Sequence, residues 1–158
     1  MGATSSRWFA GSAGAILFVV GLAKIWSGLG QAKVLTLADP ILGVSFGKLM
    51  LLVGAAELVV ASICFSKGIG PRLKVGLIAW LATNFVVYRV GLWSVGWQHP
   101  CHCMGSLAGA LHLSDKLADG VMKWVLVYLV VGSYLALWFQ YRADRPARAK
   151  GTGALPAA

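Results

Sequence analysis

Charged residues are scarce in this 158-residue sequence, and acidic residues are the scarcest of them. Only 12% of the residues are charged, and 5 Asp or Glu stand against 14 Lys or Arg. Because soluble domains contain about 25% charged residues, this chain has too little polar surface to cover a water-soluble globule. The shortage of charge excludes an ordinary soluble domain and predicts that the chain lies in a membrane.

The sequence also lacks the patterns that accompany basic charge in nucleic-acid-binding proteins. Its formal net charge is +9, yet most of the Lys and Arg lie at the edges of apolar runs and in the C-terminal tail. No interleaving of basic and aromatic residues and no nucleic-acid motif goes with them. Lys and Arg in such positions are typical of residues next to anionic lipid headgroups. We therefore predict membrane lipid, and no nucleic acid, as the partner of this charge.

Long apolar runs are what the sequence has in place of charge: 58% of its residues are hydrophobic and its mean hydropathy is +0.75. A transmembrane helix needs about 20 such residues. The first run follows Arg7 without a clear cleavage site, which favours a retained span over a signal peptide. We predict an all-α four-helix transmembrane bundle in a single domain, residues 1–140. The expected spans are about 8–26, 41–65, 75–97 and 116–139.

Two further expectations concern the ends of these spans. Pro40 suits the first turn of the second helix, since a proline there loses no helical hydrogen bond. Residues 141–158 combine Arg and Lys with Pro, Gly and Ala, and we predict a basic, disordered tail.

The distribution of Lys and Arg predicts the orientation of the bundle. Four crossings put both termini on one side, together with the turn between the second and third spans. That side carries eight basic residues, which are Arg7, Lys67, Arg72, Lys74, Arg142, Arg145, Arg148 and Lys150. The opposite loops offer mainly Lys33 and Lys116. Because cytoplasmic loops are enriched in Lys and Arg, we expect both termini in the cytoplasm. The segment between the third and fourth spans then faces the periplasm of a bacterial inner membrane.

That segment contains the candidate site, His99-Pro100-Cys101-His102-Cys103-Met104, with two of the three cysteines and two of the three histidines. Cysteines one residue apart can form a disulfide only with a bent, strained backbone. Strained, exposed disulfides have higher reduction potentials and act as labile or catalytic bonds. A protonated His102 can lower the pKa of the thiols or shuttle a proton. We predict a thiol–disulfide redox site with Cys101, Cys103 and His102 as its catalytic residues.

Two alternatives of different classes stay open. The side chains of His99, Cys101, His102, Cys103 and Met104 are soft or borderline ligands that suit Cu(I), Zn or Hg(II). However, adjacent residues cannot all face one ion, and no second cluster supplies further ligands. The other alternative is a non-catalytic assembly subunit of a larger membrane complex. The third cysteine, Cys64, is typical of a packed hydrophobic residue.

Four charged residues lie inside or near the ends of the expected spans: Lys24, Lys48, Glu57 and Arg89. A lone charge at the centre of a span costs about 2.5–3.5 kcal/mol, so such residues usually face the bundle interior and have partners. Helix geometry places Glu57 and Arg89 too far apart in depth for an ideal direct pair. One interpretation is an interior polar network that fixes the helix register. The other is an electropositive floor of Lys24, Lys48 and Arg89 that lowers the thiol pKa or holds a quinone headgroup.

Several of these segments resemble the MauE-type (methylamine utilisation) and DoxX-like family of four-helix membrane proteins. Gly21-Leu22-Ala23-Lys24 is similar to the family's opening G-x-x-K pattern, and Gly47-Lys48 with Gly54 through Glu57 resembles its acidic second helix. The segment from Cys101 to Gly105 is similar to the C-x-C-x-G segment after the third helix, although members often carry Gly or Pro where this chain has His102.

The resemblance implies a role in extracytoplasmic disulfide formation with a periplasmic thioredoxin-like or substrate protein. More loosely, it implies a sulfur oxidoreductase linked to a quinone. Fold resemblance alone fixes neither chemistry, because one fold supports many functions.

Overall fold

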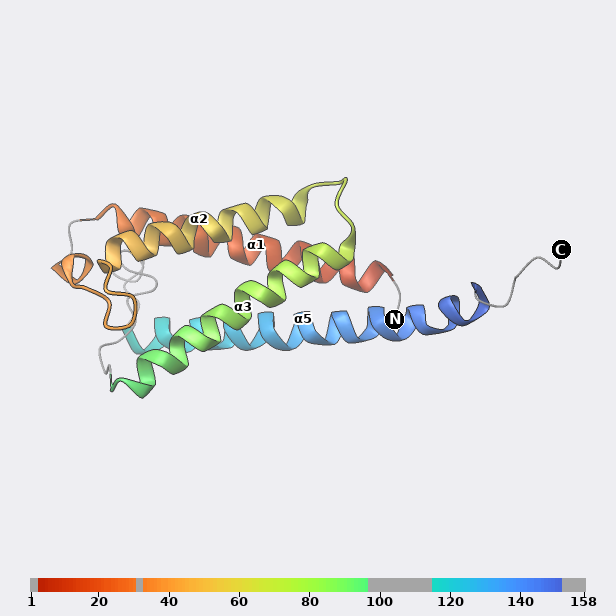
Figure 1. The fold of residues 1–158 in the computed structure, drawn as a ribbon. Helices are drawn as coiled ribbons and strands as arrows, with labels where there is room; N and C mark the ends of the chain where they lie inside the picture. Colours follow the sequence, from red (N-terminus) through yellow and green to blue (C-terminus); the bar gives the residue numbers. More distant parts are fainter. Residues whose placement is uncertain (1–2, 31–32, 97–114, 152–158) are drawn as a thin grey trace.

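The computed structural model describes residues 3–30, 33–96 and 115–151. Within these ranges the chain is α-helical apart from turns and a single β-bridge between Ala38 and Ser45. Four long helices run alternately up and down a bundle, with one short 3-10 helix, η1, between the first two (Figure 1). They are α1 (Ala3–Gly28), η1 (Lys33–Thr36), α2 (Phe46–Phe65), α3 (Pro71–Ser94) and α5 (Asp115–Gly151). The predicted all-α, four-helix bundle is confirmed.

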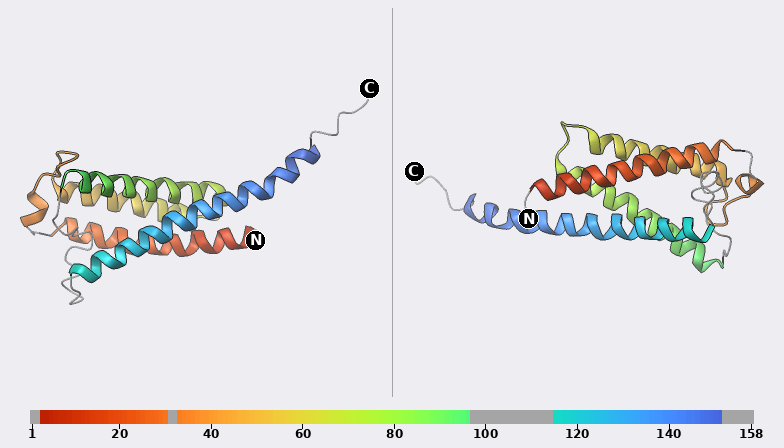
Figure 2. Two further views of the ribbon diagram at one scale, coloured as in Figure 1. Left: turned by 90° about the horizontal axis from the view of Figure 1, so that it is seen from below. Right: turned by 180° about the vertical axis from the view of Figure 1, so that it is seen from behind.

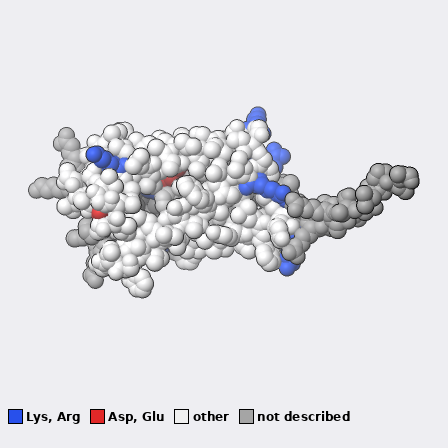
Figure 3. Space-filling model, in the orientation of Figure 1, with Lys and Arg blue, Asp and Glu red and all other residues white. Residues whose placement is uncertain are grey.

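Each long helix contains a stretch that is long and apolar enough to cross a membrane. These stretches are Ser6–Gly28, Phe46–Phe65, Pro71–Ser94 and Gly120–Ala143. Their outer faces carry large apolar side chains, such as Trp8 at 78% exposure and Trp93 at 82%. The visible surface is uncharged along most of the bundle, and most of the visible basic side chains lie at its right-hand end (Figure 3). The chain is an integral membrane protein.

The second helix begins at Phe46, not in the region of Pro40 as the sequence predicted. The residues before it form a turn in which the Asp39 side chain accepts the backbone N–H groups of Ile41 and Leu42. A side chain that binds nearby backbone in this way competes with helix formation. Gly43 then takes a positive φ of 67°, which favours glycine. The third helix begins earlier than expected, with Pro71 in its first turn.

The last helix is longer than the sequence predicted. Its backbone continues to Gly151, so residues 141–151 are helical where a disordered tail was expected. Ala and Arg, which are frequent in this stretch, are among the best helix formers, and they extend the apolar helix that precedes them. Residues 152–158 lie outside the described ranges.

Glycine lets α1 and α2 approach closely. Gly14, Gly21 and Gly28 recur at every seventh residue of α1, and Gly47, Gly54 and Ala61 recur in the same way on α2. A Cβ atom added at Gly54 would lie 2.9 Å from the carbonyl oxygen of Gly21. Backbones meet this closely in membranes where small residues line the interface. The contact between Gly21 and Gly54 fixes the register of the two antiparallel helices.

The fourth span is less buried than the others. Only 11% of the α5 span is buried, against 39% of the α1 span. Figure 2 shows α5 crossing the bundle obliquely and extending past it. The ring of Phe9 packs on Gly132, and the hydroxyls of Ser12 and Tyr128 lie 2.8 Å apart. Behind these contacts lies an apolar core that includes Leu17, Ile78 and Leu129, together with Cys64 as predicted.

The two ends of the bundle differ in what connects the helices. We call one end the loop end: it contains residues 33–45, the last turns of α1 and α3, and the first turns of α2 and α5 (Figure 1). The other is the turn end, where residues 66–70 join α2 to α3 and where α1 begins. Gly96 and Asp115, which flank the cysteine segment, both belong to the loop end.

Candidate functional site

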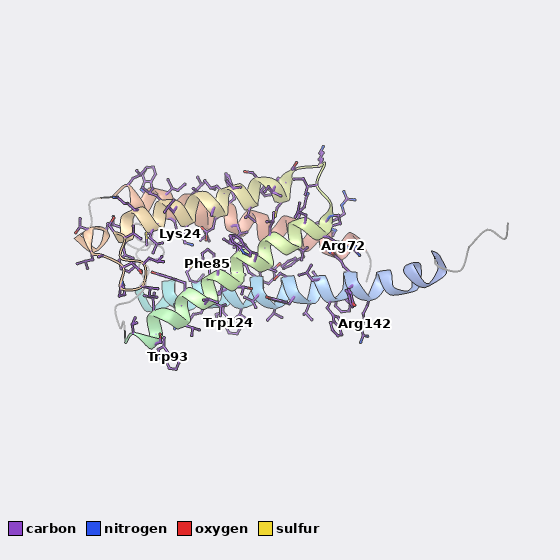
Figure 4. All side chains as sticks on the ribbon, in the orientation of Figure 1. Lys24, Arg72, Phe85, Trp93, Trp124 and Arg142 are labelled. Atoms are coloured by element: carbon purple, nitrogen blue, oxygen red, sulfur yellow. The ribbon has the colours of Figure 1, made fainter. Side chains whose placement is uncertain are left out.

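A buried ion pair lies between α1 and α2. Lys24 Nζ donates a hydrogen bond to Glu57 Oε1, and their side chains are only 8% and 1% exposed. The same ammonium group lies 4.5 Å from the centre of the Phe85 ring on α3. Figure 4 shows Lys24 and Phe85 pointing towards each other between their helices. Three helices therefore contribute one side chain each to a charged site inside the bundle.

The register of α1 and α2 explains how these two residues meet. Lys24 lies three residues beyond Gly21 towards the loop end, and Glu57 lies three residues beyond Gly54 towards the turn end. At ~1.5 Å per residue, each is displaced by about 4.5 Å from the glycine contact. Side chains lean towards the N-terminus of their own helix, so in antiparallel helices these two lean towards each other. The long side chain of Lys24 then spans the remaining distance.

One oxygen of this pair is left without a partner. Glu57 Oε2 is buried and accepts no hydrogen bond from any residue that the structure describes. A buried acceptor that has lost its water costs free energy, and more so when it carries charge. The ammonium group of Lys24 has three N–H donors, of which Glu57 Oε1 uses one. The site thus offers an open acceptor beside a cation.

A second buried carboxylate holds the loop end together. Asp39 is only 1% exposed. Its Oδ1 accepts the N–H groups of Ile41 and Leu42 at 2.8 Å each, and its Oδ2 accepts the hydroxyl of Tyr88. Ile41 also packs on Gly91, one turn beyond Tyr88 on α3. We call the Asp39–Tyr88 contact the latch, because it fastens residues 33–45 to α3. Unlike Glu57, Asp39 has a partner for each oxygen.

The predicted charges inside the spans differ in burial. Lys48 is exposed on α2, whereas Lys24 is buried and paired with Glu57. Arg89 is half-buried on α3. Because the carboxylate of Glu57 balances the charge of Lys24, Lys24 adds no net positive charge to the electropositive floor that was considered from the sequence. The Lys24–Glu57 pair agrees instead with the other interpretation, an interior polar network that fixes the register.

The cysteine segment lies outside the described residues, together with its predicted site residues His99, Cys101, His102, Cys103 and Met104. The described ranges contain no group of three or more His, Cys, Asp or Glu that could hold a metal ion. The redox and metal hypotheses for this segment therefore both stay predictions.

Sequence reasoning did not single out Asp39, Tyr88 or Phe85. For Asp39 a signal was available, because Asp followed by Pro40 and then Gly43 is typical of a turn in which the Asp side chain binds backbone N–H groups. The seven-residue spacing of glycines on both helices was a signal for the Lys24–Glu57 pair, since it aligns the two helices. Tyr88 and Phe85 lie in a long apolar helix, where the pattern gives no sign of which faces meet.

Comparisons with protein-family models, curated proteins and solved structures found no match for this chain. The resemblance to the MauE-type and DoxX-like family stays a prediction based on the motifs alone.

Proposed function

We propose that this protein is an integral membrane thiol–disulfide exchange protein of a bacterial inner membrane. Its Cys101 and Cys103 cycle between dithiol and disulfide in exchange with a periplasmic thioredoxin-like or substrate protein. The observation that carries the proposal is the Cys-x-Cys sequence in a segment whose two flanking residues, Gly96 and Asp115, both lie at the loop end. That end also contains the latch, and Lys24 of the buried ion pair lies near it in α1.

The distribution of charge supports an orientation with the loop end outside the cytoplasm. The turn end and the helix ends beside it carry Arg7, Lys67, Arg72, Lys74 and Arg142. With Arg145, Arg148 and Lys150 further along α5, that side has eight basic residues, against six towards the loop end: Lys24, Lys33, Lys48, Arg89, Lys116 and Lys123. One of the six, Lys24, is neutralised by Glu57. Because Lys and Arg are enriched on the cytoplasmic side, this asymmetry favours cytoplasmic termini and a periplasmic cysteine segment.

The proposed exchange is a two-step substitution at sulfur. A thiolate of the partner attacks one sulfur of the Cys101–Cys103 disulfide, forming a mixed disulfide and releasing the other cysteine as a thiolate. A second thiol of the partner then attacks the mixed disulfide, which leaves the partner oxidised and both cysteines reduced. The same steps in reverse oxidise the dithiol of this protein.

Net disulfide formation also needs an electron acceptor, and we propose a membrane quinone. The dithiol of Cys101 and Cys103 then gives two electrons and two protons, which yields a disulfide and a hydroquinone. The family resemblance supports this half of the proposal, as does the sequence position of the cysteines between two spanning helices, α3 and α5. An acceptor dissolved in the bilayer can reach the loop end without leaving the lipid phase.

The test is to trap the mixed disulfide in intact membranes. In the Cys103→Ser variant, the Cys101 thiolate can attack a disulfide of the partner, which forms a mixed disulfide and releases one partner thiolate, but no neighbouring thiol of this chain can then resolve the adduct. Cys101→Ser tests the reverse. We expect one of these variants to accumulate a partner adduct that disappears with reductant. Cys64→Ser, which removes the buried cysteine of α2, is the matched control and should leave trapping unchanged. Absence of adducts from both loop variants contradicts the proposal.

Mass spectrometry of the purified chain separates this function from the metal alternative. A loss of two hydrogens that reductant reverses supports the redox function. Copper or zinc bound to a chain with free thiols supports the metal alternative instead, since thiolates of this kind are soft ligands.

A further inference from the structure

The Lys24–Glu57 pair leaves one buried hydrogen-bond acceptor inside the bundle without a donor. In the described ranges, the buried side-chain polar atoms without a partner are Glu57 Oε2 and the amide atoms of Gln140. Gln140 is only partly buried and uncharged, near the turn end. Glu57 is charged and 1% exposed, so its lone oxygen carries the larger cost. Native proteins rarely leave such an atom without a donor, and ordered water or a ligand often supplies one.

The charge of the pair limits what can bind there. Lys24 and Glu57 together are neutral, and burying an extra unpaired charge beside them is costly. An ammonium ligand or an anion would each leave a net charge inside the membrane. The occupant that suits this site is therefore uncharged.

The free hydrogen-bonding positions limit the occupant further. Glu57 Oε2 needs a donor, which excludes ketones, ethers and esters as sufficient partners because they only accept. Lys24 Nζ uses one N–H on Glu57 Oε1 and faces the Phe85 ring on another side. Its remaining N–H can donate to an oxygen placed next to Oε2. A hydroxyl group, which donates once and also accepts, satisfies both neighbours at the same time.

The geometry points to a binding site for one neutral hydroxyl group, whose O–H donates to Glu57 Oε2 and whose oxygen accepts from Lys24 Nζ. Two sources share this chemistry: a buried water molecule, and the hydroxyl of a phenol or alcohol dissolved in the membrane. The Phe85 ring, whose centre lies 4.5 Å from Lys24 Nζ, suits the hydrocarbon part of the second source. The site stands independently of the cysteine chemistry, because none of its residues belongs to the cysteine segment.

The sequence makes a direct test possible, because Glu57 is the only glutamate in the chain. Labelling with carbon-13 at the glutamate carboxyl gives a single carboxylate signal, separate from the carboxamide signals of the glutamines. Solid-state NMR of the full chain in lipid bilayers then identifies which protons lie next to this carbon. The probe is para-heptylphenol, which is neutral at pH 7 because phenols titrate near ~10. Its methyl ether, para-heptylanisole, has the same shape but no O–H donor and is the matched control.

We expect the Glu57 carboxylate to correlate with a water proton in plain bilayers, or to shift saturably with para-heptylphenol and not with the ether. The first result identifies water as the occupant, and the second identifies a membrane-soluble hydroxyl. The proposal is overturned if the carbon correlates only with protein protons and does not respond to the phenol. It is also overturned if the phenol and its ether shift the signal equally.

A second experiment measures how tightly a variant binds the phenol. The double variant Lys24→Met/Glu57→Met replaces the ion pair with apolar side chains of similar length, which a buried site usually tolerates. We expect the double variant to bind labelled para-heptylphenol at least about tenfold more weakly, the loss expected from a hydrogen bond to a charged group. Lys48→Met, at an exposed position on α2, is the control and should bind like the parent. Where the phenol shifts the Glu57 signal of the parent saturably, equal binding by the double variant and the parent contradicts the proposal.

Discussion

The two ends of the bundle use lysine in different ways. At the turn end, Lys74 Nζ donates to the carbonyl oxygens of Cys64 and Ser66, at 2.9 and 2.5 Å, where α2 ends. Near the loop end, Lys24 lies inside the bundle and needs the carboxylate of Glu57 to balance it. A cation at a helix C-terminus donates hydrogen bonds to the last carbonyl groups, which have no partner within the helix. A cation between helices requires a second charge, and this pair leaves one oxygen open. The lysine inside the bundle therefore leaves a buried acceptor unpaired, whereas the lysine at the turn end does not.

The largest expected effect comes from breaking the ion pair on one side only. Glu57→Leu leaves Lys24 buried without its carboxylate, and breaking a buried pair in this way costs about 3–5 kcal/mol. The double variant Lys24→Met/Glu57→Met removes both charges and should lose far less. Reversible unfolding in mixed micelles, followed by circular dichroism, measures both. If the single and double variants are equally destabilised, the charge of Lys24 is not what makes the site sensitive.

The latch should give an intermediate effect. Tyr88→Phe removes the hydroxyl that donates to Asp39 Oδ2, and a hydrogen bond to a charged group contributes about 1.5–3 kcal/mol. Tyr134→Phe is the matched control, because it removes a hydroxyl that lies 3.0 Å from Thr83 Oγ1, a neutral partner. That loss is expected to be about 0.5–1.5 kcal/mol. The same unfolding assay compares them, and a larger loss for Tyr134→Phe would show that the latch adds little.

The smallest effect is expected at the turn end. Lys74→Met removes the donor to the last carbonyl groups of α2, and a cation at an exposed helix C-terminus contributes about 0.3–1 kcal/mol. Lys67→Met changes a lysine in the same turn that is exposed, and substitutions of that kind usually stay within about 0.5 kcal/mol. Salt in the assay should reduce the Lys74 effect, because exposed charges are screened. A loss for Lys74→Met as large as for Glu57→Leu contradicts the contrast between the two ends.

The fold was predictable because it depends on long runs of one residue class. An apolar run of about 20 residues specifies a spanning helix whatever its neighbours are, and all four spans were found in this way. The start of α2 was not, because Asp39 takes up backbone N–H groups through its side chain and delays the helix to Phe46. This competition between side-chain and helical hydrogen bonds depends on the local backbone conformation. The average hydropathy of a segment gives no information about it.

The site was predictable only in part, because it depends on which helix faces meet. Lys24 and Glu57 were both identified as interior charges, yet their pairing follows from the glycine contact between Gly21 and Gly54. Lys48, on the same helix as Glu57, points outwards and is exposed. Counting residues along a helix gives the depth of a residue in the membrane but not the side of the helix on which it lies. It therefore could not show that Glu57 faces the bundle interior whereas Lys48 faces outwards. The cysteines rest on sequence chemistry alone.

The close contact of α1 and α2 also bears on how the protein is assembled. These helices are neighbours in sequence, so little chain entropy is lost when they associate. Glycines recur along their interface, and Lys24 and Glu57 pair within it. The hairpin of α1 and α2 can thus form once α2 has entered the bilayer, before α5 has been synthesised. It then offers α3 and α5 a finished surface on which to dock.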